Sequence, residues 1–119
     1  MPKIKHIHHY QFDISNPSHA KDEVSRVLNG LIAEGLTLVG LDDGEMVETD
    51  EFTTEDYIEG ILAVGESYLY IQRDSDKDDG ETYVYFVLGN EPGVAVNDFG
   101  GKESAAVDKV TSEVYFHFN

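Results

Sequence analysis

Carboxylate side chains are concentrated in the middle of this chain. Sixteen Asp and Glu residues lie between Glu34 and Glu81, together with only two cations, Arg73 and Lys77. Sixteen negative and two positive charges give this stretch −14 of the −16 of the whole chain, so the rest sums to −2. A concentrated anionic face opposes folding through self-repulsion, but it attracts cationic partners. The chemistry that these residues offer is therefore the binding of a basic surface.

The spacing of the carboxylates suits a row of positive charges. Alternate residues of a strand repeat at about 7 Å, and residues four apart on a helix lie about 6 Å apart. Duplex phosphates repeat at a comparable step, so such carboxylates can imitate a phosphate backbone and occupy a cationic nucleic-acid channel. Glu55 and Glu59 lie four residues apart, so their like charges destabilise the expected helix. A binding function would explain why this destabilisation is tolerated. The alternative is a solvated acidic face that binds no partner. The residues expected to bind a partner are Asp42, Asp43, Glu45, Glu48, Asp50, Glu51, Glu55, Asp56 and Glu59, with Tyr57 as an apolar anchor.

An acidic loop before Gly80 is the first of two candidate metal sites. An EF-hand loop needs Gly at position 6 and a bidentate Glu at position 12, and this loop has Asp79 and Tyr85 there. A solvated hairpin tip is the simpler interpretation, with a weak calcium site of another kind as the alternative. Its possible ligands are Asp74, Asp76, Asp78 and Asp79.

The second candidate metal site consists of histidines near the N-terminus. His6 and His8 share one face of an expected strand and could share a metal, while His9 lies on the other face. His117 becomes a third ligand if the two terminal strands pair. Ordinary strand histidines are the simpler interpretation, so we expect no metal and no cofactor.

The sequence offers little that an enzyme or a nucleic-acid-binding protein would need. It contains neither GxGxxG nor GxxxxGK[ST], and no nucleophile accompanies the histidines. The eight cations are scattered, which argues against direct binding of nucleic acid. We therefore expect a protein without enzymatic activity.

Size and composition predict one folded domain over residues 1–119. The chain is 40% hydrophobic and has thirteen aromatic residues, which is enough for a core without disulfides. It has no cysteine, as suits a cytoplasmic protein. No apolar run is long enough for a signal peptide or a membrane span, so we expect neither.

The elements that must position these side chains follow from periodicity. Alternation predicts a half-buried strand over 3–14, and an apolar stripe at helical spacing predicts a helix over 17–34. Strands are expected at Leu36–Leu41 and Met46–Val47. Thr53 and Asp56 form a capping-box pattern before a second helix that ends near Val64.

The second half of the chain is dominated by a predicted hairpin. Tyr68–Arg73 and Glu81–Leu88 are rich in Tyr and Val and flank the acidic turn. Leu69, Ile71, Val84, Phe86 and Leu88 form the more apolar face, so this should be the core side. Tyr68, Tyr70, Tyr83 and Tyr85 share the other face and should be partly exposed, where they could serve as anchors for a partner in place of Tyr57.

Beyond the hairpin the signals are shorter. We expect a strand at 94–96, a break at Phe99-Gly100-Gly101, a third helical segment over 103–110 and a final strand at 112–118, where the sequence alternates. Together these elements predict an α+β fold. It has a mainly antiparallel sheet with two or three helices packed on one face.

A small, cysteine-free, acidic α+β protein with its charge clustered over about 34–81 resembles the DNA-mimic and anti-defence proteins of phages and mobile elements, including anti-CRISPR and anti-restriction inhibitors. Its general style is also similar to acidic immunity proteins that neutralise nuclease toxins. The stretch Val87-Leu88-Gly89-Asn90, with Asp98 following, resembles phage-type open reading frames. No specific motif of these groups is present, so no residue role is carried over.

The resemblance and the charge together predict an inhibitor that blocks a basic nucleic-acid-binding protein such as a defence nuclease, in the host cytoplasm if a phage encodes it. An immunity protein against a basic toxin would use nearly the same interface and differ in its genomic neighbourhood. A calcium- or metal-binding module is the alternative from another class.

Overall fold

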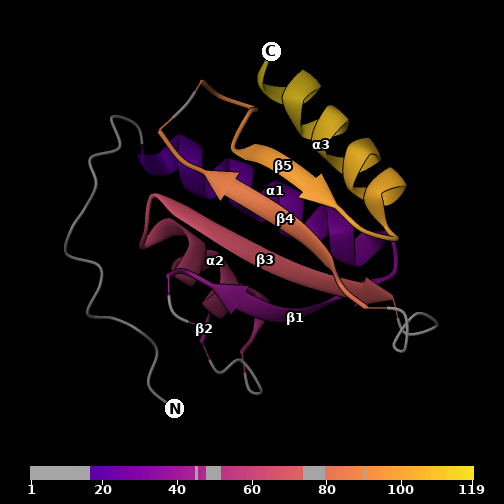
Figure 1. The fold of residues 1–119 in the computed structure, drawn as a ribbon. Coiled ribbons are helices and arrows are strands. Elements are labelled where there is room, and N and C mark those ends of the chain that lie inside the picture. Colours follow the sequence, from indigo (N-terminus) through magenta and orange to yellow (C-terminus); the bar gives the residue numbers. More distant parts are fainter. Residues whose placement is uncertain (1–16, 45, 48–51, 74–79, 90) are drawn as a thin grey trace.

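The computed structural model describes residues 17–44, 46–47, 52–73, 80–89 and 91–119 (Figure 1). The strand expected over 3–14 and the acidic hairpin tip lie outside the described residues. The elements in chain order are α1 (Pro17–Ala33), β1 (Leu36–Asp42), β2 (Met46–Val47), α2 (Thr54–Leu62), β3 (Glu66–Arg73), β4 (Thr82–Val87), β5 (Val96–Gly100) and α3 (Ser104–Phe118).

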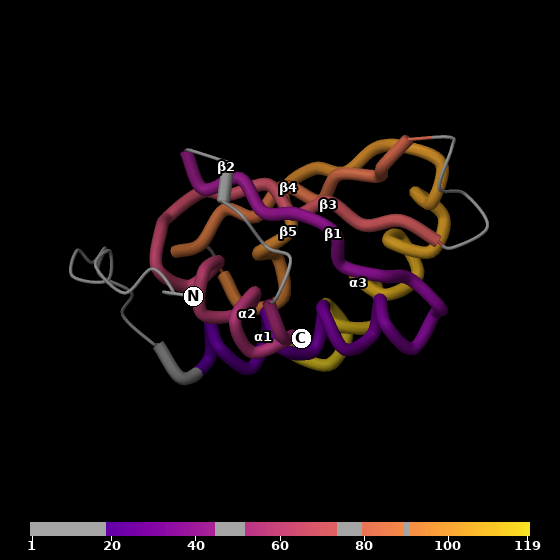
Figure 2. Tube along the Cα trace, turned by 90° about the horizontal axis from the view of Figure 1, so that it is seen from below, coloured from indigo at the N-terminus to yellow at the C-terminus, as the bar shows by residue number. Residues whose placement is uncertain are grey.

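The strands form one sheet in the order β2-β1-β3-β4-β5, and all neighbouring strands are antiparallel. The helices lie in a second layer beneath the sheet (Figure 2). Among the described residues, no element covers the opposite face of the sheet, which faces the viewer in Figure 1. The predicted α+β class with helices on one face is therefore confirmed.

The core lies between the sheet and α1, which crosses behind its central strands (Figure 1). Val24, Leu28 and Leu31 of α1 are fully buried, as the apolar stripe at helical spacing predicts. They meet the predicted core side of the hairpin, whose residues Leu69, Ile71, Val84 and Phe86 are also fully buried. Burying one such side chain contributes roughly 1.5–3 kcal/mol.

Helix α2 begins at the predicted capping box. The Thr53 hydroxyl accepts the Asp56 amide at 3.1 Å, and Asp56 Oδ2 accepts the Thr53 amide at 3.0 Å. Two orphan donors of the first turn are therefore satisfied by side chains. The helix ends at Leu62, two residues before the expected Val64.

The prediction of a final strand at 112–118 was wrong, because these residues continue α3. Val107, Val110 and Val114 are buried at helical spacing, and α3 packs against α1. Val110 lies so close to Gly30 of α1 that a methyl group on Gly30 would come within 2.7 Å of it. This packing decides the outcome over the strand propensity and alternation of the local sequence.

Strand β5 also differs from the prediction, because it runs over Val96–Gly100 and includes the Phe99-Gly100 pair expected to break the chain. Phe99 pairs with Val84 on the core side, and Gly100 pairs with Tyr83. A glycine fits this strand because the Tyr83 ring occupies the space that a side chain would need.

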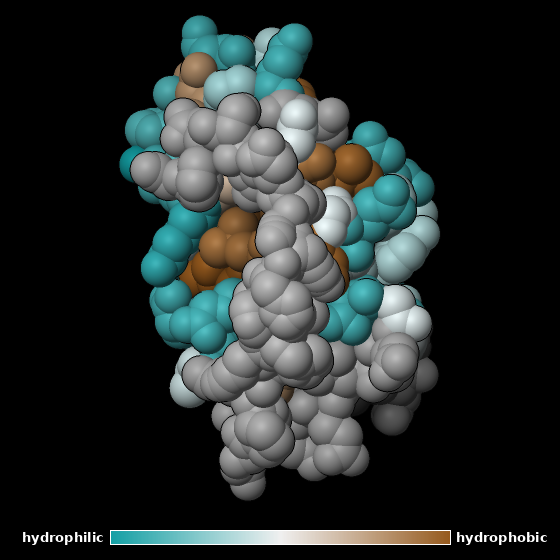
Figure 3. All heavy atoms as spheres, turned by 90° about the vertical axis from the view of Figure 1, so that its left-hand side faces the viewer, coloured by the Kyte–Doolittle hydropathy of each residue, from teal (hydrophilic) through white to brown (hydrophobic). Residues whose placement is uncertain are grey.

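Exposed apolar surface is limited in the described part of the molecule. Among the residues coloured in Figure 3, hydrophilic side chains surround separate hydrophobic areas. None of the three described helices combines the length and the hydropathy needed to cross a bilayer. The large apolar residues that are exposed are Ile32, Tyr68, Tyr115 and Phe116.

Candidate functional site

The predicted partner-binding carboxylates lie in two layers of the fold. Asp42 ends β1 opposite Tyr68, on the open face of the sheet, and Asp43 follows it in the turn toward β2. Asp42 Oδ1 accepts the Gly44 amide at 3.0 Å, which fixes this turn. Glu55, Asp56 and Glu59 belong to α2 in the helix layer. Glu45, Glu48, Asp50 and Glu51 lie outside the described residues, as do Asp74, Asp76, Asp78 and Asp79.

Two of the carboxylates on α2 have partners within the molecule. Glu55 Oε2 lies 3.4 Å from Lys21 Nζ of α1, and Asp56 belongs to the capping box. The described members of the predicted set are therefore divided between the sheet and the helix layer.

Tyr57 is a core residue, which corrects its prediction as a surface anchor. Its side chain is only 3% exposed, it packs edge-on against Phe52, and its hydroxyl donates to the Leu38 carbonyl at 3.4 Å. Tyr57 starts the apolar stripe of α2, and this stripe faces the sheet.

The hairpin tyrosines are brought together on the open face. The register pairs Tyr68 with Tyr85 and Tyr70 with Tyr83. The rings of Tyr68 and Tyr85 are stacked with centroids 4.6 Å apart, and Tyr83 meets Tyr68 edge-on at 5.9 Å. Tyr68 is 39% exposed, and the other three are partly buried by one another and by the neighbouring strands. The expectation of partly exposed tyrosines is confirmed.

Glycines in the flanking strands make room for these rings. Gly40 of β1 lies opposite Tyr70, and Gly100 of β5 lies opposite Tyr83. A Cβ on Gly100 would stand 2.9 Å from the Tyr83 ring, and one on Gly40 would stand 3.7 Å from the Tyr70 ring. The outer rings can therefore lie close to the backbone of the adjacent strands.

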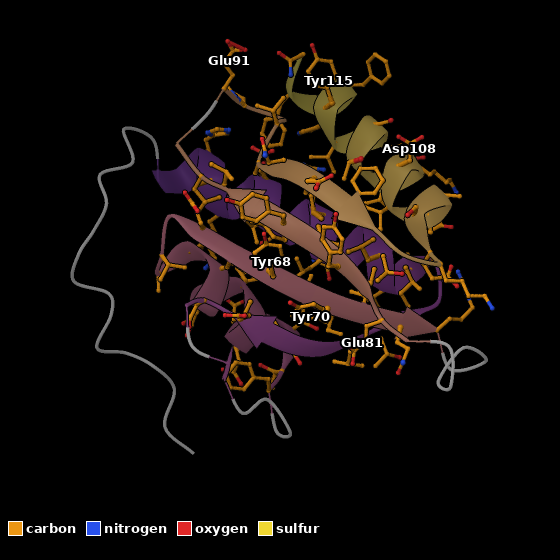
Figure 4. The ribbon with its side chains drawn as sticks, in the orientation of Figure 1. Tyr68, Tyr70, Glu81, Glu91, Asp108 and Tyr115 are labelled. Carbon is orange, nitrogen blue, oxygen red and sulfur yellow. The ribbon has the colours of Figure 1, made fainter. Side chains whose placement is uncertain are left out.

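Carboxylates surround the four rings. The Tyr83 hydroxyl donates to Asp98 Oδ2 at 3.0 Å, and the Tyr85 hydroxyl donates to Glu66 Oε1 at 2.8 Å. Asp42 and Glu81 lie near enough to Tyr70 for their charges to raise its pKa, and Figure 4 labels Tyr70 and Glu81. We call this surface the tyrosine face. It consists of Tyr68, Tyr70, Tyr83 and Tyr85 with Asp42, Glu66, Glu81 and Asp98.

The tyrosine face has no cation of its own among its described strand positions: none of them holds Lys or Arg. Two described cations, Arg73 and Lys109, make ion pairs elsewhere. Arg73 forms a bidentate pair with Glu103 at 3.0 and 3.3 Å, and Lys109 Nζ lies 2.7 Å from Glu34. These two cations are therefore paired away from the tyrosine face.

Glu66, Glu81 and Asp98 were not among the residues predicted to bind a partner. The sequence pattern could have placed Glu66 on this face, because Glu66 lies two residues before Tyr68 and so shares its side of the strand. No sequence pattern could have placed Asp98 there. Its position beside Tyr85 depends on the pairing of β4 with β5, whose register shifts after Tyr85.

The histidine site loses one of its expected ligands. His117 lies in helix α3, so it cannot join the N-terminal histidines through a strand pair. His6, His8 and His9 lie outside the described residues. Within the described ranges, no group of three or more His, Asp or Glu side chains is arranged to hold a metal ion.

Comparison of the chain with protein-family models, curated proteins and solved structures gave no match.

The electrostatics of this face predict a measurable alkaline titration. The hydrogen bond to Asp98 raises the pKa of Tyr83, and the hydrogen bond to Glu66 raises the pKa of Tyr85. Burial, followed by the charge of Asp42, raises the pKa of Tyr70. We expect Asp98→Ala to move one tyrosine back toward the ordinary value of 10.0, as followed by tyrosinate absorbance or by NMR of the ring carbons.

The same shifts fix the sign of the pH dependence. A tyrosine whose pKa is raised by folding ionises first in the unfolded chain. Its stabilising contribution is complete below pH 10.0 and is lost as the pH rises through the folded pKa. Asp108→Ala on α3 is the control for Asp98→Ala in the tyrosine titration. Equal titration curves for these two variants would contradict the hydrogen bond from Tyr83 to Asp98 as the cause of the raised pKa.

Proposed function

We propose that this protein is a non-enzymatic binding protein that docks its tyrosine face onto the basic surface of a nucleic-acid-binding protein and excludes nucleic acid from it. The observation that carries the proposal is an open sheet face on which four tyrosines are surrounded by carboxylates and no described strand position of that face holds a cation.

The charge of the face supports a basic partner. Carboxylates beside a surface of lower polarity steer cationic partners and raise the rate of association. A second copy of the chain would present the same negative charge, so self-association through this face is disfavoured. Nucleic acid is repelled for the same reason.

The tyrosines supply apolar contact surface, which charge alone does not provide. Tyr is enriched among the residues that dominate binding energy, because it buries a large rigid surface and keeps a polar hydroxyl. Stacking of Tyr68 on Tyr85 and the bonds from Tyr83 and Tyr85 to their carboxylates hold this surface in shape before a partner arrives. Less conformational entropy is then lost on binding.

The carboxylates of the tyrosine face are also suited to imitating a row of phosphates. Glu66 and Asp98 are held at positions on different strands by tyrosine hydroxyls, so their charges keep a fixed spacing. A basic channel built for nucleic acid is lined by Lys and Arg that meet phosphates at repeating intervals. Fixed carboxylates can occupy several of these positions at once.

The test is a displacement assay with two variants of equal charge. A fluorescent DNA duplex is bound to a synthetic peptide of alternating Arg and Lys, and this protein is added as the competitor. The face variant is Asp42→Asn, Glu66→Gln and Asp98→Asn, which removes three charges and keeps an oxygen at each hydrogen bond. The control variant is Glu91→Gln, Asp108→Asn and Glu113→Gln, all at exposed positions. Glu91 and Asp108 lie away from the tyrosine face in Figure 4, and Glu113 belongs to α3.

We expect the wild-type protein to release the duplex and the face variant to be at least about tenfold weaker. The control variant should stay within about twofold of wild type, because distant exposed charges are screened. Direct binding of the peptide to the wild-type protein, measured without the duplex, should also weaken steeply with salt. Equal loss in both variants, or no release of the duplex by the wild type, would overturn the proposal.

A further inference from the structure

We infer that the tyrosine face selects arginine over lysine, so that the partner presents an arginine-rich segment to it. The inference rests on the proposed function, since it names the chemistry of the partner that the same face would bind. Three observations carry it: the ordered tyrosine rings, the carboxylates held beside them, and the absence of a cation at the described strand positions of the face.

The rings offer the surface that a guanidinium prefers. Tyr68 is the most exposed of the four, and its stacking partner Tyr85 holds its plane with an interplanar angle of 19°. A guanidinium is planar and weakly hydrated, so it stacks on an aromatic face with little loss of hydration. The ammonium of lysine is a compact, strongly hydrated charge and gains less from the same contact.

The carboxylates are placed to complete the contact. Asp98 uses Oδ2 and Glu66 uses Oε1 to accept tyrosine hydroxyls, and each carboxylate has a second oxygen with its own lone pairs. A guanidinium stacked beside these rings carries several N–H donors in its own plane, directed toward carboxylates at the rim of the stack. The hydroxyls of Tyr83 and Tyr85 fix the carboxylates beside the rings in the unbound protein.

The arrangement of strands places these groups within reach of neighbouring side chains of one partner segment. Glu66, Tyr68 and Tyr70 alternate along β3, and Tyr83 and Tyr85 lie beside them on β4. Positions that share one face of a strand repeat at about 7 Å. An extended segment with arginines on alternate residues repeats at the same step.

The experiment compares an all-arginine with an all-lysine peptide of equal length, binding to the full chain by calorimetry at fixed salt. We expect the arginine peptide to bind about tenfold more tightly. In the tyrosine variant Tyr68→Leu with Tyr85→Leu, this ratio should fall to about twofold, since charge is retained and the aromatic surface is lost. The control Phe116→Leu removes an exposed aromatic residue on α3 and should leave the ratio unchanged.

The outcomes separate this inference from the function on which it rests. Equal binding of both peptides, still weakened by the face variant, would overturn arginine selection and leave a face that binds cations. An arginine preference that survives in the tyrosine variant would also overturn it. Failure of both peptides to bind the wild-type chain would count against the proposed function as well. Circular dichroism of each variant confirms that the fold is retained.

Discussion

Replacing Glu23 with alanine is expected to destabilise the protein by about 3 kcal/mol. Glu23 lies in α1 and is only 2% exposed. Its two carboxylate oxygens accept the backbone amides of Gly93 at 3.0 Å and Ala95 at 2.7 Å. These bonds tie the segment between β4 and β5 to the helix layer. Alanine would leave both amides without an acceptor, and an unsatisfied buried donor costs about 1–3 kcal/mol.

The measurement is the free energy of unfolding by urea, with Asp22→Ala as the matched control. Asp22 precedes Glu23 in α1, but it is exposed and, among the described residues, its ion pair is with Arg26 one turn away. Its loss should therefore cost less than about 0.5 kcal/mol. Hydrogen exchange should show the amides of Gly93 and Ala95 losing protection first. A loss below about 1 kcal/mol for Glu23→Ala would show that the segment is held by other contacts.

Replacing Gly101 with alanine is expected to cost about 3 kcal/mol as well. Gly101 joins β5 to α3 with φ +131°, a conformation that residues with a side chain rarely adopt. A Cβ there would lie 2.7 Å from Thr82 Cα and 3.1 Å from the Glu81 carbonyl oxygen. These are backbone atoms of the strand entering the sheet, so they cannot move aside as a flexible side chain would.

Gly89→Ala is the control for this prediction. Gly89 has φ +93°, but no described atom beyond its chain neighbours lies within 4 Å of the position that a Cβ would take there. Alanine therefore costs only the strain of the conformation, about 1 kcal/mol. Thermal and urea unfolding should therefore separate the two variants by about 2 kcal/mol. Equal losses would mean that the approach of Thr82 to Gly101 contributes nothing beyond backbone strain.

Much of the fold could be predicted because its signals are local. The apolar stripe of α1 and the reciprocal bonds of Thr53 and Asp56 depend on residues within one or two turns of helix. Alternation separated the core side of the hairpin from its tyrosine side, because successive side chains of a strand point to opposite faces. Both assignments are confirmed by burial.

The site was predicted less completely than the fold. Clustering in the sequence favoured the carboxylates near α2, but Glu55 and Asp56 are engaged within the molecule and Tyr57 is in the core. Charge density along a chain does not say which layer each side chain occupies. Asp98 joins the tyrosine face only because β5 pairs with β4. The periodicity within either segment does not indicate this pairing.

The sequence by itself determined the charge of the molecule, the class of fold and the separation of tyrosines from apolar residues along the hairpin, because each depends on composition or on short-range periodicity. Tertiary structure decided that residues 112–118 are helical, that Tyr57 is buried and that one face of the sheet is left uncovered by the described elements. The physical reason is that these outcomes depend on which surfaces pack together. Burial of Val110 and Val114 against α1 favours helix where the alternating pattern alone favours strand.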